Sequence, residues 1–118
     1  MSSLESLTEQ IRAFAEERDW GQFHTPKNLA MALAGEVGEL LAELQWLTPE
    51  ASAAVMADEE AGNRIRNEIG DVMIYLVRLA DVLGIDLLEA ARAKLQDSAQ
   101  RYPADVVRGS SKKVPRTG

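Results

Sequence analysis

The sequence predicts a single-domain, all-α protein, and three observations support this. Apolar residues recur at spacings of three and four, the repeat of one face of an α-helix. The sequence has no convincing run of alternating apolar and polar residues typical of strands. Cap residues, prolines and a glycine stand where the apolar patterns begin or end. The 118 residues are enough for one modest core.

Two predicted helices fill most of the first 47 residues. The first covers residues 4–18, where apolar side chains form a stripe that stops before Gly21. The second begins after Thr25, a cap residue followed by a proline suited to the first helical turn. Its apolar pattern continues to Leu47.

Three further helical segments follow. A short alanine-rich turn ends at Met56. Asp58 caps a long apolar pattern, and Gly84 ends it as a C-terminal cap. Asp86 has the spacing of a capping box with the glutamate three residues later, and the helix it starts ends before Pro103.

Composition excludes several classes of site. Thirteen Lys and Arg against 19 Asp and Glu give a formal charge of -6, so nucleic acid is not an expected partner. The chain has no Cys and one His, His24, which excludes disulfides, thiolate zinc sites and imidazole clusters within one chain. No apolar run approaches the roughly 20 residues that span a bilayer, and no signal-peptide pattern is present. We therefore expect a cytoplasmic protein with no membrane partner.

Charge divides the chain into two regions. Residues 1–100 carry eight basic and 18 acidic groups, a net charge of -10, whereas residues 101–118 carry five basic and one acidic group. The last residues combine Gly, Ser, Pro and cations and have too little apolar surface to fold. We predict one domain over residues 1–106 and a flexible basic tail over residues 107–118.

Two pairs of acids mark the two long helices. At about 100° per residue, Glu36 and Glu39 lie together at the edge of the apolar face of one helix, and Glu68 and Asp71 lie likewise on the other. An isolated pair of this kind is usually a solvated face. Here neither pair has a Lys or Arg at i+4, and a glycine beside the second acid of each pair indicates close packing there.

Four carboxylates brought together by helix packing require a cation to offset their repulsion. Oxygen donors without imidazole or thiolate favour Mg²⁺, with Mn²⁺ as a substitute, over zinc, copper or calcium. Magnesium held by few carboxylates accepts substrate phosphates, so the expected chemistry is phosphoryl or nucleotidyl transfer to water. Which carboxylate orients the water stays open.

Short motifs follow one another along most of the chain in a characteristic order. They are Arg18-Asp19-Trp20, Gln22-Phe23-His24, Pro26-Lys27-Asn28-Leu29, Gly35-Glu36-Val37-Gly38-Glu39-Leu40, Trp46, Glu68-x-x-Asp71-Val72-x-x-Tyr75-Leu76 and Arg101-Tyr102-Pro103. In this order the sequence, over about residues 4–110, resembles the MazG-like all-α nucleoside triphosphate pyrophosphohydrolases, and most of all their dCTP pyrophosphatase branch.

The resemblance implies Mg²⁺-dependent hydrolysis of a nucleoside triphosphate to the monophosphate and pyrophosphate, with dCTP or a modified or related deoxynucleotide favoured. The role would be house-cleaning or control of the nucleotide pool. The implied metal-binding and catalytic residues are Glu36, Glu39, Glu68 and Asp71. The implied substrate contacts are Trp20, Gly21, Gln22, Phe23, His24, Trp46 and Tyr75, with His24 toward phosphate or sugar.

Other functions stay open at this point. Ile11 and Ser98 stand where the dCTP branch carries a His and an Asn, so an enzyme of the same superfamily acting on dUTP or another nucleotide is an alternative. A non-catalytic helical interaction module explains the bundle but not the duplicated acid pairs. Trp20 and Trp46, taken alone, are more typical of core or interface packing.

The two long helices are apolar or small on most sides, more than short helices of the same chain can cover. We therefore expect a symmetric homodimer, or the homotetramer that the resemblance implies. In such an assembly, Trp20 or Trp46 can act on the substrate of a neighbouring subunit.

Overall fold

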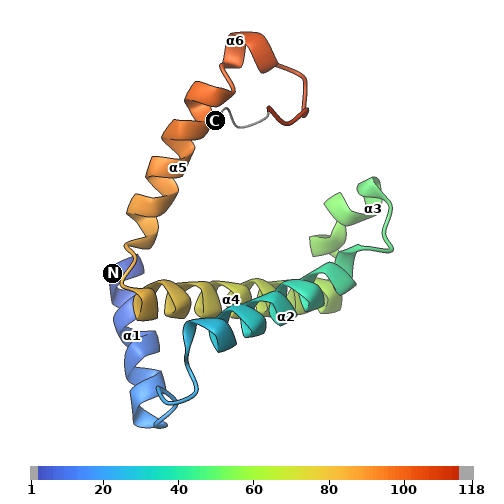
Figure 1. Ribbon diagram of the computed structural model, residues 1–118. Helices are drawn as coiled ribbons and strands as arrows, with labels where there is room; N and C mark the ends of the chain where they lie inside the picture. Colours follow the sequence, from blue (N-terminus) through green and yellow to red (C-terminus); the bar gives the residue numbers. More distant parts are fainter. Residues whose placement is uncertain (1–2, 115–118) are drawn as a thin grey trace. The chain divides into compact units, whose positions relative to one another are not determined.

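The computed structural model describes residues 3–114, and within that range its regular elements are all helices. They are α1 (Leu4–Glu17), α2 (Pro26–Leu44), α3 (Pro49–Ala53), the 3-10 helix η1 (Val55–Ala57), α4 (Glu59–Leu83), α5 (Leu87–Arg101) and α6 (Ala104–Val107) (Figure 1). The predicted all-α class and its two long helices are confirmed. In the described part of the chain, no helix is both long enough and apolar enough to cross a bilayer.

Contacts divide the described residues into two compact units, one ending at Ile85 and the other beginning at Asp86. In the second unit, the backbone N–H of Val114 donates to the Tyr102 hydroxyl at 2.8 Å. The predicted domain over residues 1–106 and the predicted flexible tail over residues 107–118 stay predictions, and residues 115–118 of that tail lie outside the described residues.

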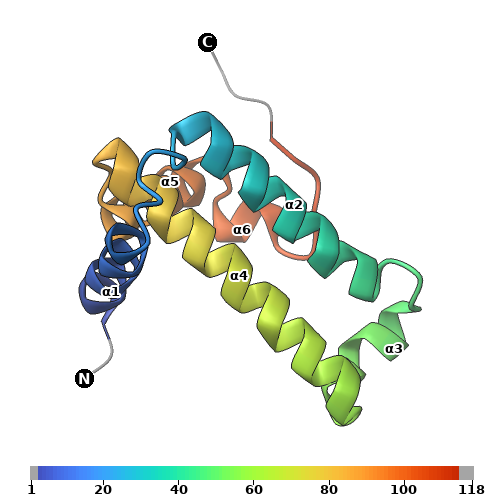
Figure 2. The same ribbon diagram turned by 90° about the horizontal axis from the view of Figure 1, so that it is seen from below.

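The first unit is organised around α2 and α4, which lie side by side and run antiparallel (Figure 2). Leu29 of α2 and Ile65 and Val77 of α4 are buried. Burying side chains of this size stabilises a fold by about 1.5–3 kcal/mol each. The packing of α2 on α4 therefore sets the relative positions of the side chains that the two helices carry.

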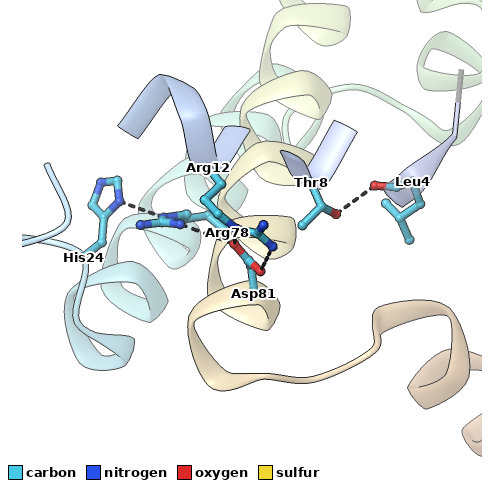
Figure 3. Close-up of polar contacts among 6 residues, drawn as sticks. All are labelled: Leu4, Thr8, Arg12, His24, Arg78 and Asp81. Carbon is cyan, nitrogen blue, oxygen red and sulfur yellow. Dashed lines mark hydrogen bonds and ion pairs between the residues drawn. The ribbon is translucent and has the colours of Figure 1, made fainter. Parts of the chain in front are cut away.

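Helix α1 packs against α4, near the C-terminal end of that helix, and buries Ile11 and Ala15 (Figures 1 and 2). Arg12 of α1 adds a polar link, because its Nε and Nη2 donate to the two carboxylate oxygens of Asp81 on α4 at 2.9 and 2.7 Å (Figure 3). Arg78, also on α4, lies 3.4 Å from the same carboxylate. These contacts fix α1 on the end of α4.

Predicted caps begin and end the helices. Thr25, Asp58 and Asp86 each accept a hydrogen bond from the backbone N–H three residues further on, at 3.2, 3.2 and 3.0 Å. Gly84 ends α4 at φ 71° and ψ 27°, a left-handed conformation that costs glycine little. The cap predictions at these positions are confirmed.

The C-terminal end of α2 differs from the sequence pattern. The apolar pattern extends to Leu47, but the helix ends at Leu44. Thr48 is extended, at φ -66° and ψ 159°, because the following proline disfavours helical backbone in the residue before it. The chain therefore leaves the helix before Thr48, and the apolar residues near that end lie in a turn.

Several large apolar side chains of the two long helices are exposed. Leu41 of α2 is 55% exposed, and Ile69 of α4 is 53% exposed. A Cβ atom added at Gly38 or Gly70 would meet no atom within 4 Å. No neighbour within the described residues therefore fills the space beside these two glycines, and the expectation that they accommodate a closely packed helix stays a prediction.

Replacing Asp81 by Asn is expected to lower the free energy of unfolding by roughly 1–2 kcal/mol at neutral pH, because two guanidinium groups lose their charged acceptor. Asp97→Asn is the matched control. Asp97 pairs with Lys94 at 3.3 Å through a side chain that is 61% exposed, and its loss is expected to change stability by less than about 0.5 kcal/mol. Urea unfolding followed by circular dichroism measures both.

The same pair predicts a pH dependence. The hydrogen bond from Arg12 holds the pKa of Asp81 below its ordinary value. The unfolded chain then binds this proton more tightly than the folded protein, so the stabilisation is fully present above about pH 4 and is lost as the pH falls through the lowered pKa. The difference in stability between wild type and Asp81→Asn should shrink below about pH 4. An undiminished difference in stronger acid contradicts this assignment.

Candidate functional site

Three of the four predicted acids meet where α2 packs on α4. Glu36 and Glu39 lie one turn apart on α2, and Glu68 projects from α4. One carboxylate oxygen from each of these residues lies within 4.8 Å of the other two. We refer to Glu36, Glu39 and Glu68 as the acidic cluster. The antiparallel packing of the two helices creates it, since residues of α2 and α4 are far apart in the sequence.

The carboxylates of the cluster are in an electrostatically unfavourable position. Oε2 of Glu36 and Oε2 of Glu68 are buried from solvent and have no hydrogen-bond partner among the described residues. Burial and the negative charge of Glu39 raise the pKa of Glu36. Burial, with the neighbouring carboxylates of Glu39 and Glu36, raises the pKa of Glu68 to about 7. Near neutral pH, a proton and a cation therefore compete for binding to the cluster.

The residues present fit a divalent cation. Two buried oxygens without a partner supply the negative, unsaturated ligands that a cation stabilises, and all three donors are carboxylate oxygens. Hard cations such as Mg²⁺ and Mn²⁺ prefer this donor type. Glu36, Glu39 and Glu68 are thus the residues of this chain that can hold such an ion.

The fourth predicted ligand, Asp71, lies one turn further along α4 and is outside the group of three oxygens. Its charge nevertheless contributes to the raised pKa of Glu36, so it lies near the cluster. Tyr75 follows one turn later and is half-buried. Glu68, Asp71 and Tyr75 therefore form a row of polar side chains along α4 that leads away from the cluster.

On the other side of the cluster, charge is balanced directly. Arg64 of α4 donates to Glu43 of α2 through Nε at 3.0 Å. The sequence indicated no partner for the acids of α2 within their own helix, and the balancing cation comes from the neighbouring helix. Glu43 is accordingly paired, whereas the two buried oxygens of the acidic cluster are not.

The predicted substrate residues of the 20–24 segment lie near the C-terminal end of α4. The rings of Trp20 and His24 are 6.2 Å apart in an edge arrangement, and Nδ1 of His24 accepts a hydrogen bond from Nε of Arg78 at 3.0 Å (Figure 3). The side-chain amide of Gln22 donates to the backbone oxygen and a carboxylate oxygen of Asp19. Gly21 and Phe23, which complete the segment, are both exposed.

Trp46, the remaining predicted substrate residue, is separated from this segment. It lies in the turn after α2 and is 88% exposed. Helix α2, which begins just after His24 and ends just before Trp46, has 19 residues and is therefore about 28 Å long. Trp46 and the 20–24 segment therefore lie beyond opposite ends of this helix.

Sequence reasoning assigned no role to Arg78, Asp81 or Arg12, which form a polar cluster beside His24 (Figure 3). One signal was available. Arg78 is the only charged residue between Asp71 and Asp81, in a stretch of α4 that is otherwise apolar apart from Tyr75. A cation at such a position is expected to have a partner, because an unpaired buried charge is costly.

An antiparallel helix pair that carries clustered carboxylates is typical of all-α proteins that bind divalent cations between packed helices. A family model described as the MazG-like family matches residues 32–115, and the chain belongs to this family. Its helices superpose on a crystal structure of a pyrophosphatase from Archaeoglobus fulgidus with a TM-score of 0.80. That match has 36% sequence identity and covers 87% of this chain and 94% of the other.

The sequence is also similar to curated proteins named dCTP pyrophosphatase 1. It is 41% identical to the protein of Homo sapiens over 111 residues, which cover 94% of this chain and 65% of that protein. The match to the protein of Mus musculus has 40% identity over 109 residues and covers 92% of this chain and 64% of that protein. The chain thus spans slightly less than two thirds of the length of these curated relatives.

Mg²⁺ is expected to raise the melting temperature of the wild-type protein, because the cation binds the folded cluster and offsets its repulsion. At a concentration about a hundredfold above the dissociation constant, the gain in unfolding free energy is about 2.7 kcal/mol. Glu68→Gln should be more stable than wild type without Mg²⁺ and should lose most of the Mg²⁺ response. Glu9→Gln, at an exposed position of α1, is the control and should retain the response.

The pH dependence of the metal-free protein follows from Glu68. Because its pKa is raised from 4.5 to about 7, the folded protein binds this proton more tightly than the unfolded chain does. The contribution is fully present below about pH 4.5 and is lost as the pH rises through 7. The melting temperature of wild type relative to Glu68→Gln should fall over this interval, and an increase would refute the assignment.

Proposed function

We propose that the protein hydrolyses a nucleoside triphosphate to the monophosphate and pyrophosphate with the help of Mg²⁺, for which Mn²⁺ can substitute. The observation that carries this proposal is the acidic cluster, with its two buried, unpartnered carboxylate oxygens. Membership of the MazG-like family and similarity to proteins named as pyrophosphatases support the same activity.

The cluster residues have distinct parts in this proposal. Glu36, Glu39 and Glu68 hold the cation, and Asp71, one turn along α4, is the fourth acidic residue facing the phosphates. The cation, when bound, neutralises phosphate charge and makes water a better nucleophile at neutral pH. The four carboxylates repel phosphate in the absence of a cation, which explains why substrate binding should require one.

The same acidic residues are also the proposed acceptors of the proton that the attacking water loses. Hydrolysis adds water across the bond between the α and β phosphates, so the attacking water must lose a proton as pyrophosphate leaves. A carboxylate within hydrogen-bond reach of that water can orient it and accept the proton. Glu36, Glu39, Glu68 and Asp71 are the candidates, and separate substitutions at each position distinguish them.

We propose dCTP, or a related or modified deoxynucleotide, as the substrate, in control or cleaning of the nucleotide pool. The names of the curated relatives, at 40–41% identity, support this choice. Trp20 is 42% exposed near the start of α2 and offers an aromatic face to a base. Gly21, Gln22, Phe23, His24 and Tyr75 remain the proposed contacts on the same chain.

A second copy of the chain completes the proposed enzyme. The exposed apolar faces of α2 and α4 need a covering surface, and the open space at Gly38 and Gly70 allows a helix to approach closely. Trp46 and Trp20 lie beyond opposite ends of α2, which is about 28 Å long. We therefore place Trp46 at the substrate of a neighbouring subunit in a homodimer or homotetramer. A cytoplasmic location and the absence of nucleic-acid or membrane partners stay predictions.

Glu68→Gln and Asp71→Asn are each expected to reduce turnover at least a hundredfold while the helical content stays unchanged, because each removes charge from the cation and phosphate site. The assay supplies dCTP, dUTP, other canonical triphosphates and modified triphosphates with Mg²⁺. It separates monophosphate and pyrophosphate from diphosphate and phosphate. Glu9→Gln is the control with wild-type activity.

The product pattern decides between the candidate functions. Release of pyrophosphate from dUTP but not from dCTP would identify dUTP as the substrate. Release of phosphate, or full activity in a Glu68→Gln, Asp71→Asn double variant, overturns the proposed chemistry. A protein without turnover on any triphosphate, and without a Mg²⁺ response, is the helical interaction module instead.

Leu41→Arg is expected to shift the protein toward monomers, because it places a charge on the exposed apolar face of α2. Gln10→Arg adds the same side chain at an exposed position of α1 and should leave the assembly intact. Sedimentation velocity at matched concentrations measures both variants. A wild-type protein that sediments as a monomer contradicts the proposed assembly.

A further inference from the structure

The polar cluster at the C-terminal end of α4 is built around a buried cation. Arg78 is 8% exposed, and its guanidinium has two kinds of partner (Figure 3). Nη1 lies 3.4 Å from a carboxylate oxygen of Asp81, which also accepts from Arg12. The second partner is His24, because Nε of Arg78 donates to its Nδ1 at 3.0 Å. Arg78 therefore joins the fixed end of α4 to the segment that precedes α2.

This contact sets the protonation of the imidazole. A guanidinium has only N–H donors and no acceptor, so Nδ1 of His24 must present its lone pair to Arg78. The ring proton of the neutral imidazole is then on Nε2. Burial lowers the pKa of His24, and the positive charge of Arg78 lowers it further. Nε2 has no hydrogen-bond partner among the described residues, so its N–H is available to a ligand.

The position of this donor along α4 indicates which part of the substrate it meets. Arg78 follows Asp71 by seven residues and Glu68 by ten, which places it about 10–15 Å further along the helix axis. A nucleotide whose phosphates lie at the acidic cluster can reach this donor with its nucleoside if it extends toward the C-terminal end of α4. Trp20, with its ring 6.2 Å from that of His24, supplies an aromatic surface at the same end.

We propose that Arg78 is a positioning residue that holds His24 as a neutral Nε2–H donor to an uncharged oxygen of the nucleoside. The role rests on the proposed hydrolysis of a nucleoside triphosphate. Asp81 and Arg12 act through Arg78, since the carboxylate balances the buried guanidinium and the second arginine fixes the carboxylate. His24 thus contacts the nucleoside, and the acidic cluster binds the phosphates.

The single histidine allows a direct test of the protonation state. In the full-length protein labelled with ¹⁵N-histidine, every imidazole signal comes from His24. Wild type is expected to show a protonated Nε2 and an unprotonated Nδ1, with a His24 pKa below its ordinary value. Arg78→Met should give a mixture of both neutral forms and a higher His24 pKa, because both the donor and the charge are lost.

Asp97→Asn is the matched control for this spectrum. It removes an exposed carboxylate that pairs with Lys94 and leaves Arg78 and its partners in place, so the Nε2–H form should persist. A wild-type protein with the proton on Nδ1, or an Arg78→Met spectrum identical to wild type, overturns the positioning role. The wild-type spectrum alone decides the first point, even if Arg78→Met does not fold.

The kinetic test uses the triphosphate that wild type hydrolyses best. His24→Leu and Arg78→Met should each raise KM about tenfold and change kcat by less than about twofold, because an uncharged hydrogen bond to a nonreacting part of the substrate is lost. The double variant should be no worse than His24→Leu, since Arg78 acts through His24. Additive losses in the double variant contradict the proposal.

Two ligands separate the possible contacts. Inorganic tripolyphosphate with Mg²⁺ should inhibit wild type and His24→Leu equally. A tenfold weaker inhibition of the variant would show that His24 binds phosphate and would overturn the proposal. A 2′,3′-dideoxynucleotide lacks the sugar hydroxyl. If His24→Leu has no effect on its KM, the acceptor is that hydroxyl. An unchanged tenfold effect assigns the contact to another uncharged oxygen of the nucleoside, on the base or in the sugar ring.

Failure of this inference and failure of the proposed function give different results. The spectrum of His24 needs no substrate and no turnover. A wild-type protein with the expected Nε2–H form that hydrolyses no triphosphate removes the proposed enzyme and with it the assigned ligand. A protein that releases pyrophosphate but shows the proton on Nδ1 keeps its activity and loses only the role of Arg78.

Discussion

The packing of α2 against α4 is the constraint on which the rest of the structure depends. It buries Leu29 and Val77 and thereby brings carboxylates of like charge into contact distance. Apolar burial stabilises this arrangement, whereas the acids oppose it. The conflict is resolved differently along the interface. Arg64 neutralises Glu43, and the neighbouring acidic cluster keeps its charge unbalanced for a cation.

Most of the fold could be predicted from the sequence because its signals are local. Thr25 and Asp58 identify helix starts through their own side chains, and Gly84 identifies a helix end through its backbone freedom. The apolar periodicity predicts an end of α2 too far along the chain, since it continues past the point where Thr48 must become extended. Local periodicity does not contain that competing effect.

The candidate site was only partly predictable. The spacing of Glu36 and Glu39, and the matching spacing of Glu68 and Asp71 on the other long helix, is enough to predict a shared cluster. It did not show that Asp71 lies outside the three closest oxygens, because this depends on the relative shift of two helices. The link from Arg78 to His24 spans 54 residues and has no local signature. Tertiary packing alone creates it.

The raised pKa of Glu68 has a consequence for how the protein exchanges ions with its surroundings. At neutral pH a share of the molecules without metal carries a proton on this carboxyl group, since its pKa is raised to about 7. A divalent ion that occupies the cluster must displace that proton into solution. Cation uptake is therefore accompanied by acid release, and the heat evolved will vary with the ionisation enthalpy of the surrounding buffer.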